Sequence, residues 1–364
     1  MNSLISSGQQ FGEGVNWGKV QDTAMALLIS PVVGFVAAAL LLLAAKAVIS
    51  NPALYQAPEG KAPPPLWIRA LLVLTCTSVS FAHGSNDGQK GMGLIVLILV
   101  GIVPATFALN LGSSAESLHQ LSSSATQFAA SLEQVPGTRP ARPDEATAHK
   151  ALTQYLRSGH VKPDTFAALG VANAGVAARL AHVDDLTTLP GAERRALRLD
   201  AYLVSESLTR LVKGKALPAP VDETAATSYQ KALKGLTNFI PTWVKVAVAL
   251  ALGLGTMIGW KRIVVTVGEK IGKAHLTYAQ GASAELVAFA TIQAADVLGL
   301  PVSTTHILSS GIAGTMVANG SGVQRETVRN ILLAWVLTLP VCVLLGAALF
   351  GASLLFVLRV LGAH

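Results

Sequence analysis

The chain has 364 residues, of which 51% are hydrophobic and 13% are charged, with a formal net charge of +7. Soluble domains carry about 25% charged residues, so this composition and the mean hydropathy of +0.52 exclude an ordinary soluble protein. The positive excess is explained by Lys and Arg in loops beside membrane helices, and a nucleic-acid partner is not expected.

Six apolar runs follow one another along the chain. A membrane-spanning helix needs about 20 apolar residues, and the runs that meet or approach this length are Ala24–Val48, Leu66–Phe81, Gly91–Leu109, Ile240–Trp260, Gly281–Leu300 and Ile331–Val360. Met1–Ser7 lacks the basic region of a secretory signal. Cys76 and Cys342 both lie within predicted spans, so neither a disulfide nor a cysteine metal site is expected.

These runs divide the chain into five segments. Residues 1–48 contain one span, residues 49–65 form a Pro-rich linker, and residues 66–111 contain two more apolar runs. Residues 112–238 are a polar insertion with short helical patterns, for which a small helical domain and a loose loop remain open. Residues 239–364 return to apolar sequence.

A faint internal repeat relates the start of the chain to its end. Gly14–Val20 precedes a helix that contains Ser30-Pro31, and Gly322–Val328 precedes a helix that contains Leu339-Pro340. Repeated halves are common in secondary transporters. On this interpretation, the first segment is the tail of a first repeat whose front is missing, and the chain after the linker is a complete second repeat.

The first candidate site is the run Phe81–Gly91, which places Ser85, Asn86, Asp87 and Lys90 among glycines. Glycine lets a helix unwind, and unwound backbone inside a bilayer is tolerated only where it is buried in protein or lines a water-filled cavity. A carboxylate there is costly, so Asp87 is a candidate for holding a cation or exchanging a proton. An ordinary turn between two spans, with Asp87 and Lys90 in water, is the alternative.

The second candidate site follows Pro301, which can end one helix and begin another. Ser303, Thr304 and Thr305 would then lie at a helix N-terminus, where free N–H groups and hydroxyls can bind an anion such as phosphate. Simple N-capping is the alternative, because one hydroxyl caps a helix without any ligand. For His306, a proton-linked group and a structural histidine remain equally open.

The third candidate is Glu285, an acid inside an apolar run that begins just after Gln280. Such acids are rare in membrane helices, and Glu285 either faces a cavity or reaches the membrane surface. The two apolar stretches on either side of Pro301 predict a helical hairpin. No P-loop, dinucleotide fingerprint, zinc motif or nucleophile elbow is present, so the sequence does not predict an enzyme.

Together, these motifs resemble a known family. His83–Gly91 and Pro301–His306 resemble the paired signatures of the phosphate inorganic transporter family, and Gly255–Arg262, Gly268–Lys273 and Leu276–Gly281 are similar to its bacterial low-affinity, proton-coupled members. The resemblance covers the chain from Val20 to the C-terminus apart from the insertion. It implies an all-α inverted-repeat transporter with broken helices and a hairpin, its first repeat incomplete because each signature occurs here once.

The resemblance implies that the Asn-Asp and Ser-Thr-Thr motifs converge on phosphate and coupling cations, with Gln280 nearby. With the candidates above, the predicted phosphate-binding residues are Ser85, Asn86, Asp87, Ser303, Thr304 and Thr305. The predicted residues for cation or proton coupling are Asp87, Gln280, Glu285 and His306. No resident cofactor or protein-bound metal is expected.

The expected function is secondary symport of phosphate with protons across the cell inner membrane by a multi-pass protein. The resemblance implies that phosphate travels as a neutral complex with a divalent metal; free phosphate and a homodimeric assembly remain open. The alternatives are a transporter or channel for another oxyanion such as sulfate, and a non-transporting truncated fragment. The basic cluster Lys261–Lys273 is expected on the cytoplasmic side.

Overall fold

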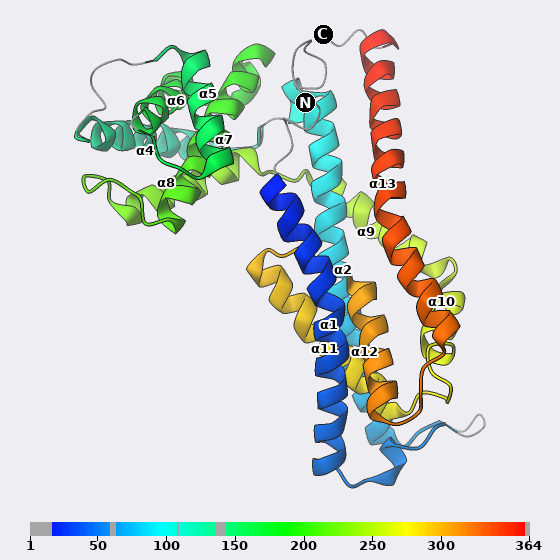
Figure 1. Cartoon of the computed structure of the whole chain (residues 1–364). Coiled ribbons are helices and arrows are strands. Elements are labelled where there is room, and N and C mark those ends of the chain that lie inside the picture. Colours follow the sequence, from blue (N-terminus) through cyan, green and yellow to red (C-terminus); the bar gives the residue numbers. More distant parts are fainter. Residues whose placement is uncertain (1–16, 59–62, 108, 136–142, 163, 361–364) are drawn as a thin grey trace. The chain divides into compact units, whose positions relative to one another are not determined.

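The computed structural model describes residues 17–58, 63–107, 109–135, 143–162 and 164–360. The predicted all-α class is confirmed (Figure 1), because the regular elements of these residues are helices, with one isolated bridge between Gly272 and Val323. Gly14, Val15 and Asn16, at the start of the predicted repeat, lie outside the described residues.

The chain divides into two compact units, described separately below. The membrane unit comprises Met1–Leu94 and Thr242–Leu355, and the insertion unit comprises Ile95–Pro241 and Phe356–His364. The helices that begin in the membrane unit are α1 (Trp17–Val48), α2 (Leu66–Ile102), α9 (Thr242–Met257), α10 (Trp260–Glu269), α11 (Tyr278–Leu298), α12 (Thr304–Ala318) and α13 (Arg325–Val360).

Within the described residues, four helices are long and apolar enough to cross a membrane: Val20–Val48, Leu66–Ile102, Tyr278–Leu298 and Arg325–Phe356. The prediction of separate spans at Leu66–Phe81 and Gly91–Leu109 is wrong, because one continuous helix, α2, covers most of both. The apolar run predicted at Ile240–Trp260 forms the shorter α9 and then turns at Gly259, whose φ is 82°.

Small residues hold α1 against α12. A Cβ added at Gly34 would overlap the carbonyl oxygen of Ile307, and one added at Gly314 would overlap the carbonyl oxygen of Phe35. Near the ends of the same helices, Lys46 Nζ donates to Asn319 Oδ1 at 2.6 Å. Close backbone approach through small residues is a usual way for membrane helices to associate, because lipid is as apolar as the helix surfaces.

The predicted break at Pro301 is present between α11 and α12. Gly299, with a φ of 65°, caps the end of α11, and Ser303 caps the start of α12 by accepting a hydrogen bond from the backbone N–H of His306. At the other end of α11, Thr277 and Gln280 form a reciprocal capping box. These caps fix the lengths of the two arms, so the chain reverses at Gly299–Val302.

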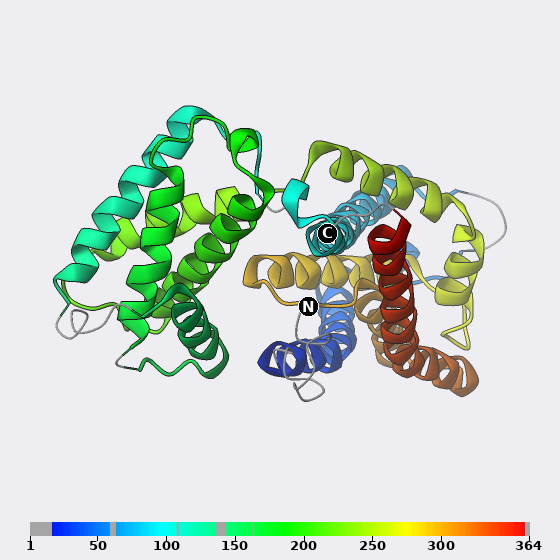
Figure 2. The ribbon, with the colours of Figure 1, turned by 90° about the horizontal axis from the view of Figure 1, so that it is seen from above.

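In the described part of the insertion unit, five longer helices pack around one apolar core (Figure 2): α4 (Ala115–Glu133), α5 (Glu145–Ser158), α6 (Thr165–Leu180), α7 (Gly191–Lys213) and α8 (Glu223–Thr237). The short α3 (Pro104–Phe107) precedes them. Ser114, Asp144 and Asp222 accept hydrogen bonds from the first turns of α4, α5 and α8. These side-chain caps explain why the polar sequence folds into discrete helices.

Candidate substrate site

Four polar side chains of α2 lie on one face of the helix. His83, Asn86, Asp87 and Lys90 are spaced by three or four residues, which places them one above another on successive turns. The predicted unwinding of Phe81–Gly91 is wrong, because α2 is helical throughout this run.

Two glycines of this run, Gly88 and Gly91, serve the packing of α2 against α9. A Cβ at Gly91 would lie 3.3 Å from Val248 of α9, and one at Gly88 would lie 3.9 Å from Leu252. Gly91, and less tightly Gly88, therefore leave room for the side chains of α9 rather than breaking α2.

Asn86 is the buried member of the group, with 3% of its surface exposed. Its Nδ2 donates to Asp296 Oδ1 of α11 at 2.5 Å. Its Oδ1 accepts a hydrogen bond from Lys90 Nζ, which also donates to the carbonyl oxygen of Val302 at 2.5 Å. Lys90 therefore joins the Asn-Asp motif of α2 to the chain break that precedes the Ser-Thr-Thr motif.

Asp87 is paired mainly with His83 and shares Lys90 with Asn86 at a longer distance. Its Oδ2 lies 2.8 Å from His83 Nε2, and its Oδ1 lies 4.0 Å from Lys90 Nζ. The exposed fraction of the Asp87 side chain is 35%, so the carboxylate remains accessible to an ion or a proton. Ser85 Oγ accepts a long hydrogen bond of 3.4 Å from Gln89 Nε2.

A cavity of about 410 Å³ opens beside these contacts. Asn86, Gln89 and Lys90 line one side of it, and Asp296 and the Gly299–Pro301 turn line another. Asp22 and Thr23 of α1 complete the wall. The cavity thus has an ammonium group, two side-chain amides and two carboxylates among its lining residues.

The three predicted hydroxyl residues occupy different environments. Ser303 is the N-cap of α12, which agrees with the simple capping alternative, although its own hydroxyl hydrogen is not used in that bond. Thr304 is buried and Thr305 is exposed. The carbonyl oxygen of Val302, directly before them, accepts the hydrogen bond from Lys90.

Gln280 is not brought to this cluster. It is fully buried at the start of α11, where its side chain binds the backbone N–H of Thr277 and donates to the carbonyl oxygen of Thr315. Asp296 lies sixteen residues further along α11, about 24 Å at the rise of an α-helix. The contacts of Gln280 are therefore those of a residue that caps a helix.

Glu285 and His306 also lie apart from the cavity lining. Glu285 Oε2 accepts a hydrogen bond of 2.5 Å from Thr75 Oγ1, which is fully buried. The ring of His306 stacks on Trp335 of α13 with centroids 4.0 Å apart, and its Nδ1 is buried without a partner among the described residues. Glu285 therefore faces α2 inside the unit.

Lys90, Asp296 and Thr75 belong to this arrangement but were not among the predicted site residues. Asp296 lies shortly before the chain break at Pro301, and Thr75 is one of several hydroxyl residues within a long apolar run. The available signal was their charge or polarity inside predicted spans, where polar groups are usually paired. Their partners, Asn86 and Glu285, are 210 residues away in each case.

Comparison with known proteins bears on this site. A model of the phosphate transporter family matches residues 3–346. The chain belongs to the phosphate transporter family. The predicted family is therefore confirmed over nearly the whole chain, the insertion included.

Three relatives illustrate the similarity within the phosphate transporter family. The low-affinity inorganic phosphate transporter PitA of Escherichia coli K12 is 36% identical over 371 residues, which cover 98% of this chain and 73% of PitA. PitB of the same strain is 35% identical over 97% of this chain and 73% of its own length. A probable low-affinity inorganic phosphate transporter of Bacillus subtilis is 46% identical over 33% of this chain and 36% of its own length.

These relatives are named as transporters, so the chain is assigned to a transporter class and not to an enzyme class. No solved structure matches the chain.

Proposed function

We propose that this chain carries inorganic phosphate across a membrane as a secondary transporter, with protons as the coupling ion. The observation that carries the proposal is the pair of hydrogen bonds from Lys90 Nζ, to Asn86 and to Val302. This ammonium group links Asn86 of the first predicted motif to Val302, the residue before the second motif, and it lines a cavity of about 410 Å³. A phosphate oxygen that replaces either acceptor would gain a charge-assisted hydrogen bond.

The charges around the cavity support coupling to a cation. Lys90 supplies one positive charge, whereas Asp22 and Asp296 on the wall and Asp87 beside it supply three negative charges. A phosphate anion added to this group increases the negative excess, which is costly in a poorly hydrated site. Protons, or a divalent metal bound to phosphate, would remove that cost. We therefore propose entry of phosphate together with protons, as a neutral metal–phosphate complex.

Phosphate fits this site better than sulfate does. At neutral pH phosphate keeps at least one P–OH group, which can donate a hydrogen bond to a carboxylate, whereas sulfate is only an acceptor. Asp87 and Asp296 are acceptors when ionised, so they would repel sulfate without compensation. A site with buried hydrogen-bonding groups discriminates strongly against a ligand that leaves them unpaired.

The test is uptake of radiolabelled phosphate by the purified chain in proteoliposomes, with and without an inward proton gradient. We expect gradient-dependent uptake that excess sulfate does not inhibit and that a chelator of divalent metals reduces. Asp87→Asn should abolish uptake while the protein still inserts and elutes as a single species. Absence of uptake, or equal competition by sulfate, would overturn the assignment to phosphate. Uptake that the chelator does not reduce would overturn only the proposal that phosphate travels as a metal complex.

We further propose that the protein is a multi-pass protein of the cell inner membrane and works as a homodimer. The four helices of membrane-spanning length support the first part. Membrane fractionation tests the location, and chemical cross-linking of the detergent-purified protein tests the dimer. A purely monomeric cross-linking pattern would contradict the dimer and leave the transport proposal in place.

A further inference from the structure

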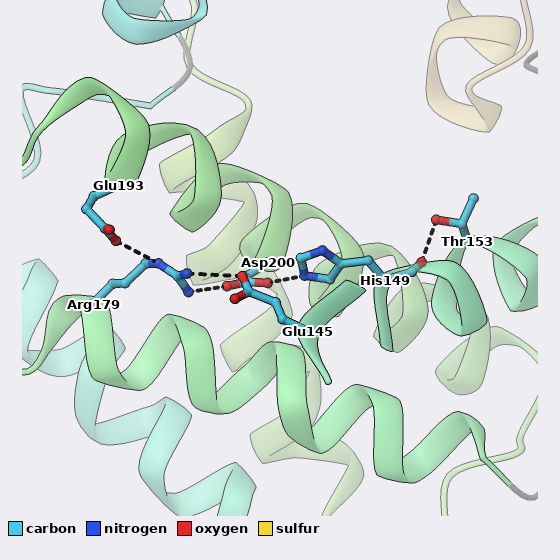
Figure 3. A network of polar contacts seen from close by, with 6 residues as sticks. All are labelled: Glu145, His149, Thr153, Arg179, Glu193 and Asp200. Atoms are coloured by element: carbon cyan, nitrogen blue, oxygen red, sulfur yellow. Dashed lines mark hydrogen bonds and ion pairs between the residues drawn. The ribbon is translucent and has the colours of Figure 1, made fainter. Parts of the chain in front are cut away.

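A second polar cluster lies in the insertion unit, within its own helices (Figure 3). Glu145 and His149 are four residues apart on α5, and Asp200 of α7 faces them. One ligand atom from each of the three residues lies within 4.8 Å of the others. One imidazole and two carboxylates on two helices form a donor set that can bind a metal ion.

This cluster runs from a half-exposed ligand, Glu145, to a ligand buried inside the unit, Asp200. The side chain of Asp200 is 0% exposed, and that of His149 is 17% exposed. On α6, a Cβ at Gly175 would overlap the Asp200 carboxylate and the Arg179 guanidinium. The glycine therefore leaves the space that the carboxylate occupies.

Arg179 of α6 does not balance the charge of this cluster. Its guanidinium lies 2.6 Å from Asp200, 3.0 Å from Glu145 and 3.0 Å from Glu193. Three carboxylates surround one guanidinium, so two negative charges remain when His149 is neutral. A single divalent cation would balance them.

The two oxygens of Asp200 have different partners, and only one of them is bound by Arg179 among the described residues. Arg179 binds Oδ2, whereas Oδ1 lies 2.6 Å from His149 Nε2. Ligands of zinc lie about 2.0–2.2 Å from the ion, so neighbouring donor atoms are roughly 3 Å apart. A small separation of His149 from Asp200 would admit an ion in place of the hydrogen between them.

We propose that Glu145, His149 and Asp200 form a divalent transition-metal site in the insertion unit, with Arg179 holding Asp200 from the other side. The imidazole favours zinc or a similar ion over magnesium and calcium, which prefer oxygen ligands. In the loaded site the proton of the neutral imidazole is on Nδ1, and water completes the coordination. Because the ligands come from α5 and α7, the bound ion ties these helices together.

The same unit contains a natural control. His119 Nε2 lies 2.7 Å from Asp184 Oδ1, at side-chain exposures of 53% and 77%. This histidine–carboxylate pair resembles that of His149 and Asp200 in distance, yet it is exposed and is not part of a three-ligand group among the described residues. If any histidine–aspartate pair bound the probe metal, both sites would respond.

The experiment uses the full chain, purified in detergent and stripped of metal with a chelator. It is titrated with Co²⁺, whose binding is detected by visible absorption. The Co²⁺ is then displaced by Zn²⁺, and the heat of displacement is measured by calorimetry. The variants are His149→Gln, which keeps a donor toward Asp200, Glu145→Gln, which alters a half-exposed ligand, and His119→Gln as the control. Far-UV circular dichroism verifies that each variant keeps its helix content.

We expect one equivalent of metal in the wild-type protein. His149→Gln should weaken metal binding by more than roughly 10- to 100-fold, which is the usual effect of losing a residue that only supports a metal ligand. Glu145→Gln should weaken metal binding measurably. His119→Gln should leave metal binding unchanged. No stoichiometric binding by the folded wild-type protein would overturn the proposal. Undiminished binding by His149→Gln, or equal loss in His119→Gln, would also overturn it.

Discussion

Thr75 of α2 and Glu285 of α11 are joined by a hydrogen bond of 2.5 Å. Eleven residues later on both helices, Asn86 and Asp296 form another of 2.5 Å. Eleven residues are close to three helical turns, so both contacts lie on the same faces of two helices that run in the same direction. The Glu285 carboxylate is therefore about 16 Å along the helices from the cavity at Asn86.

This separation leads to a prediction for proton coupling. Glu285→Gln keeps an oxygen that accepts the hydrogen bond from Thr75 but cannot take up a proton near neutral pH. If Glu285 carries the coupled proton, the variant should lose uptake driven by a proton gradient and retain exchange of internal for external phosphate. Both are measured with radiolabelled phosphate in proteoliposomes.

The matched control is Glu326→Gln, at an exposed acid in the first turn of α13. It should behave as the wild type in both assays. Gradient-driven uptake by Glu285→Gln at the wild-type rate would show that the coupled proton is held elsewhere.

A second prediction concerns Asn86. Asn86→Asp removes the donor to Asp296 and places two carboxylates about 2.5 Å apart, where they cannot both be ionised without a large cost. We expect phosphate uptake to fall to background, and the variant to be less stable to heat in detergent.

The control for Asn86 is Asn319→Ala, which removes the contact with Lys46 at the far end of α12. This variant should keep most of the wild-type uptake. Wild-type uptake by Asn86→Asp would mean that the Asn86–Asp296 pair is not part of the substrate site.

The third prediction concerns the packing of α1 on α12. Gly314→Ala places a methyl group against the backbone of Phe35, and overpacking of this kind typically costs 1–3 kcal/mol. Thermal unfolding in detergent should therefore shift to lower temperature. Gly346→Ala on α13, where a Cβ would have no neighbour within 4 Å, should leave it unchanged; an equal shift in both variants would argue against the close approach.

The fourth prediction concerns the core of the insertion unit. Tyr229 donates to Asn173 Oδ1 at 2.8 Å, and Asn173 donates to the carbonyl oxygen of Ala125 at 2.8 Å. Tyr229→Phe leaves a buried acceptor unpaired and should destabilise the unit by about 1–3 kcal/mol. Tyr202→Phe, at a tyrosine with 47% exposure, is the control and should change the denaturant midpoint little.

The fifth prediction is a pH dependence. Hydrogen bonds from Thr147 hold the pKa of Asp144, the N-cap of α5, below its usual value. The pKa of Asp144 is lower in the folded state than in the unfolded state, so the ionised carboxylate stabilises the fold. This stabilisation is complete above the unfolded pKa of about 3.9 and is lost as the pH falls through the folded pKa. Unfolding of the insertion unit, followed by circular dichroism at decreasing pH, should become easier below about pH 4.

Asp144→Asn keeps a capping oxygen but does not titrate. Its stability should therefore fall less steeply than that of the wild type over the same acidic range. Parallel curves for the two proteins would exclude Asp144 as a source of the acid sensitivity.

The sequence predicted the class of the fold and several of its parts because those depend on local chemistry. The apolar runs gave the long helices, and Gly299 with Pro301 marked the break between α11 and α12. The meaning of the glycines in Phe81–Gly91 could not be read locally. Glycine serves both unwinding and close packing, and the side chain that decides here, Val248, lies far along the chain.

The site was predicted in part for the same reason. Asn86 and Ser303 stood out as polar groups at unusual positions, but their relation depends on Lys90, which reaches across to Val302. Gln280 is polar and lies in a similar motif, yet its side chain is used within the start of its own helix and by the neighbouring α12. Which polar residues of a span meet is determined by the register of the helices, and the sequence does not specify that register.

Because α2 is unbroken, the two sides of the cavity differ in how easily they can move, and the turn between α11 and α12 is the side that can be displaced more easily. A continuous helix resists bending at Asn86, whereas the turn after α11 is held by the capping hydrogen bonds that Gly299 and Leu300 donate to the last carbonyl groups of that helix. Any widening of the cavity by displacement of this turn must first detach the ammonium group of Lys90 from Val302. Lys90 thus ties the continuous α2 to the turn between α11 and α12, and an anion that draws the ammonium group toward itself would also loosen that tie.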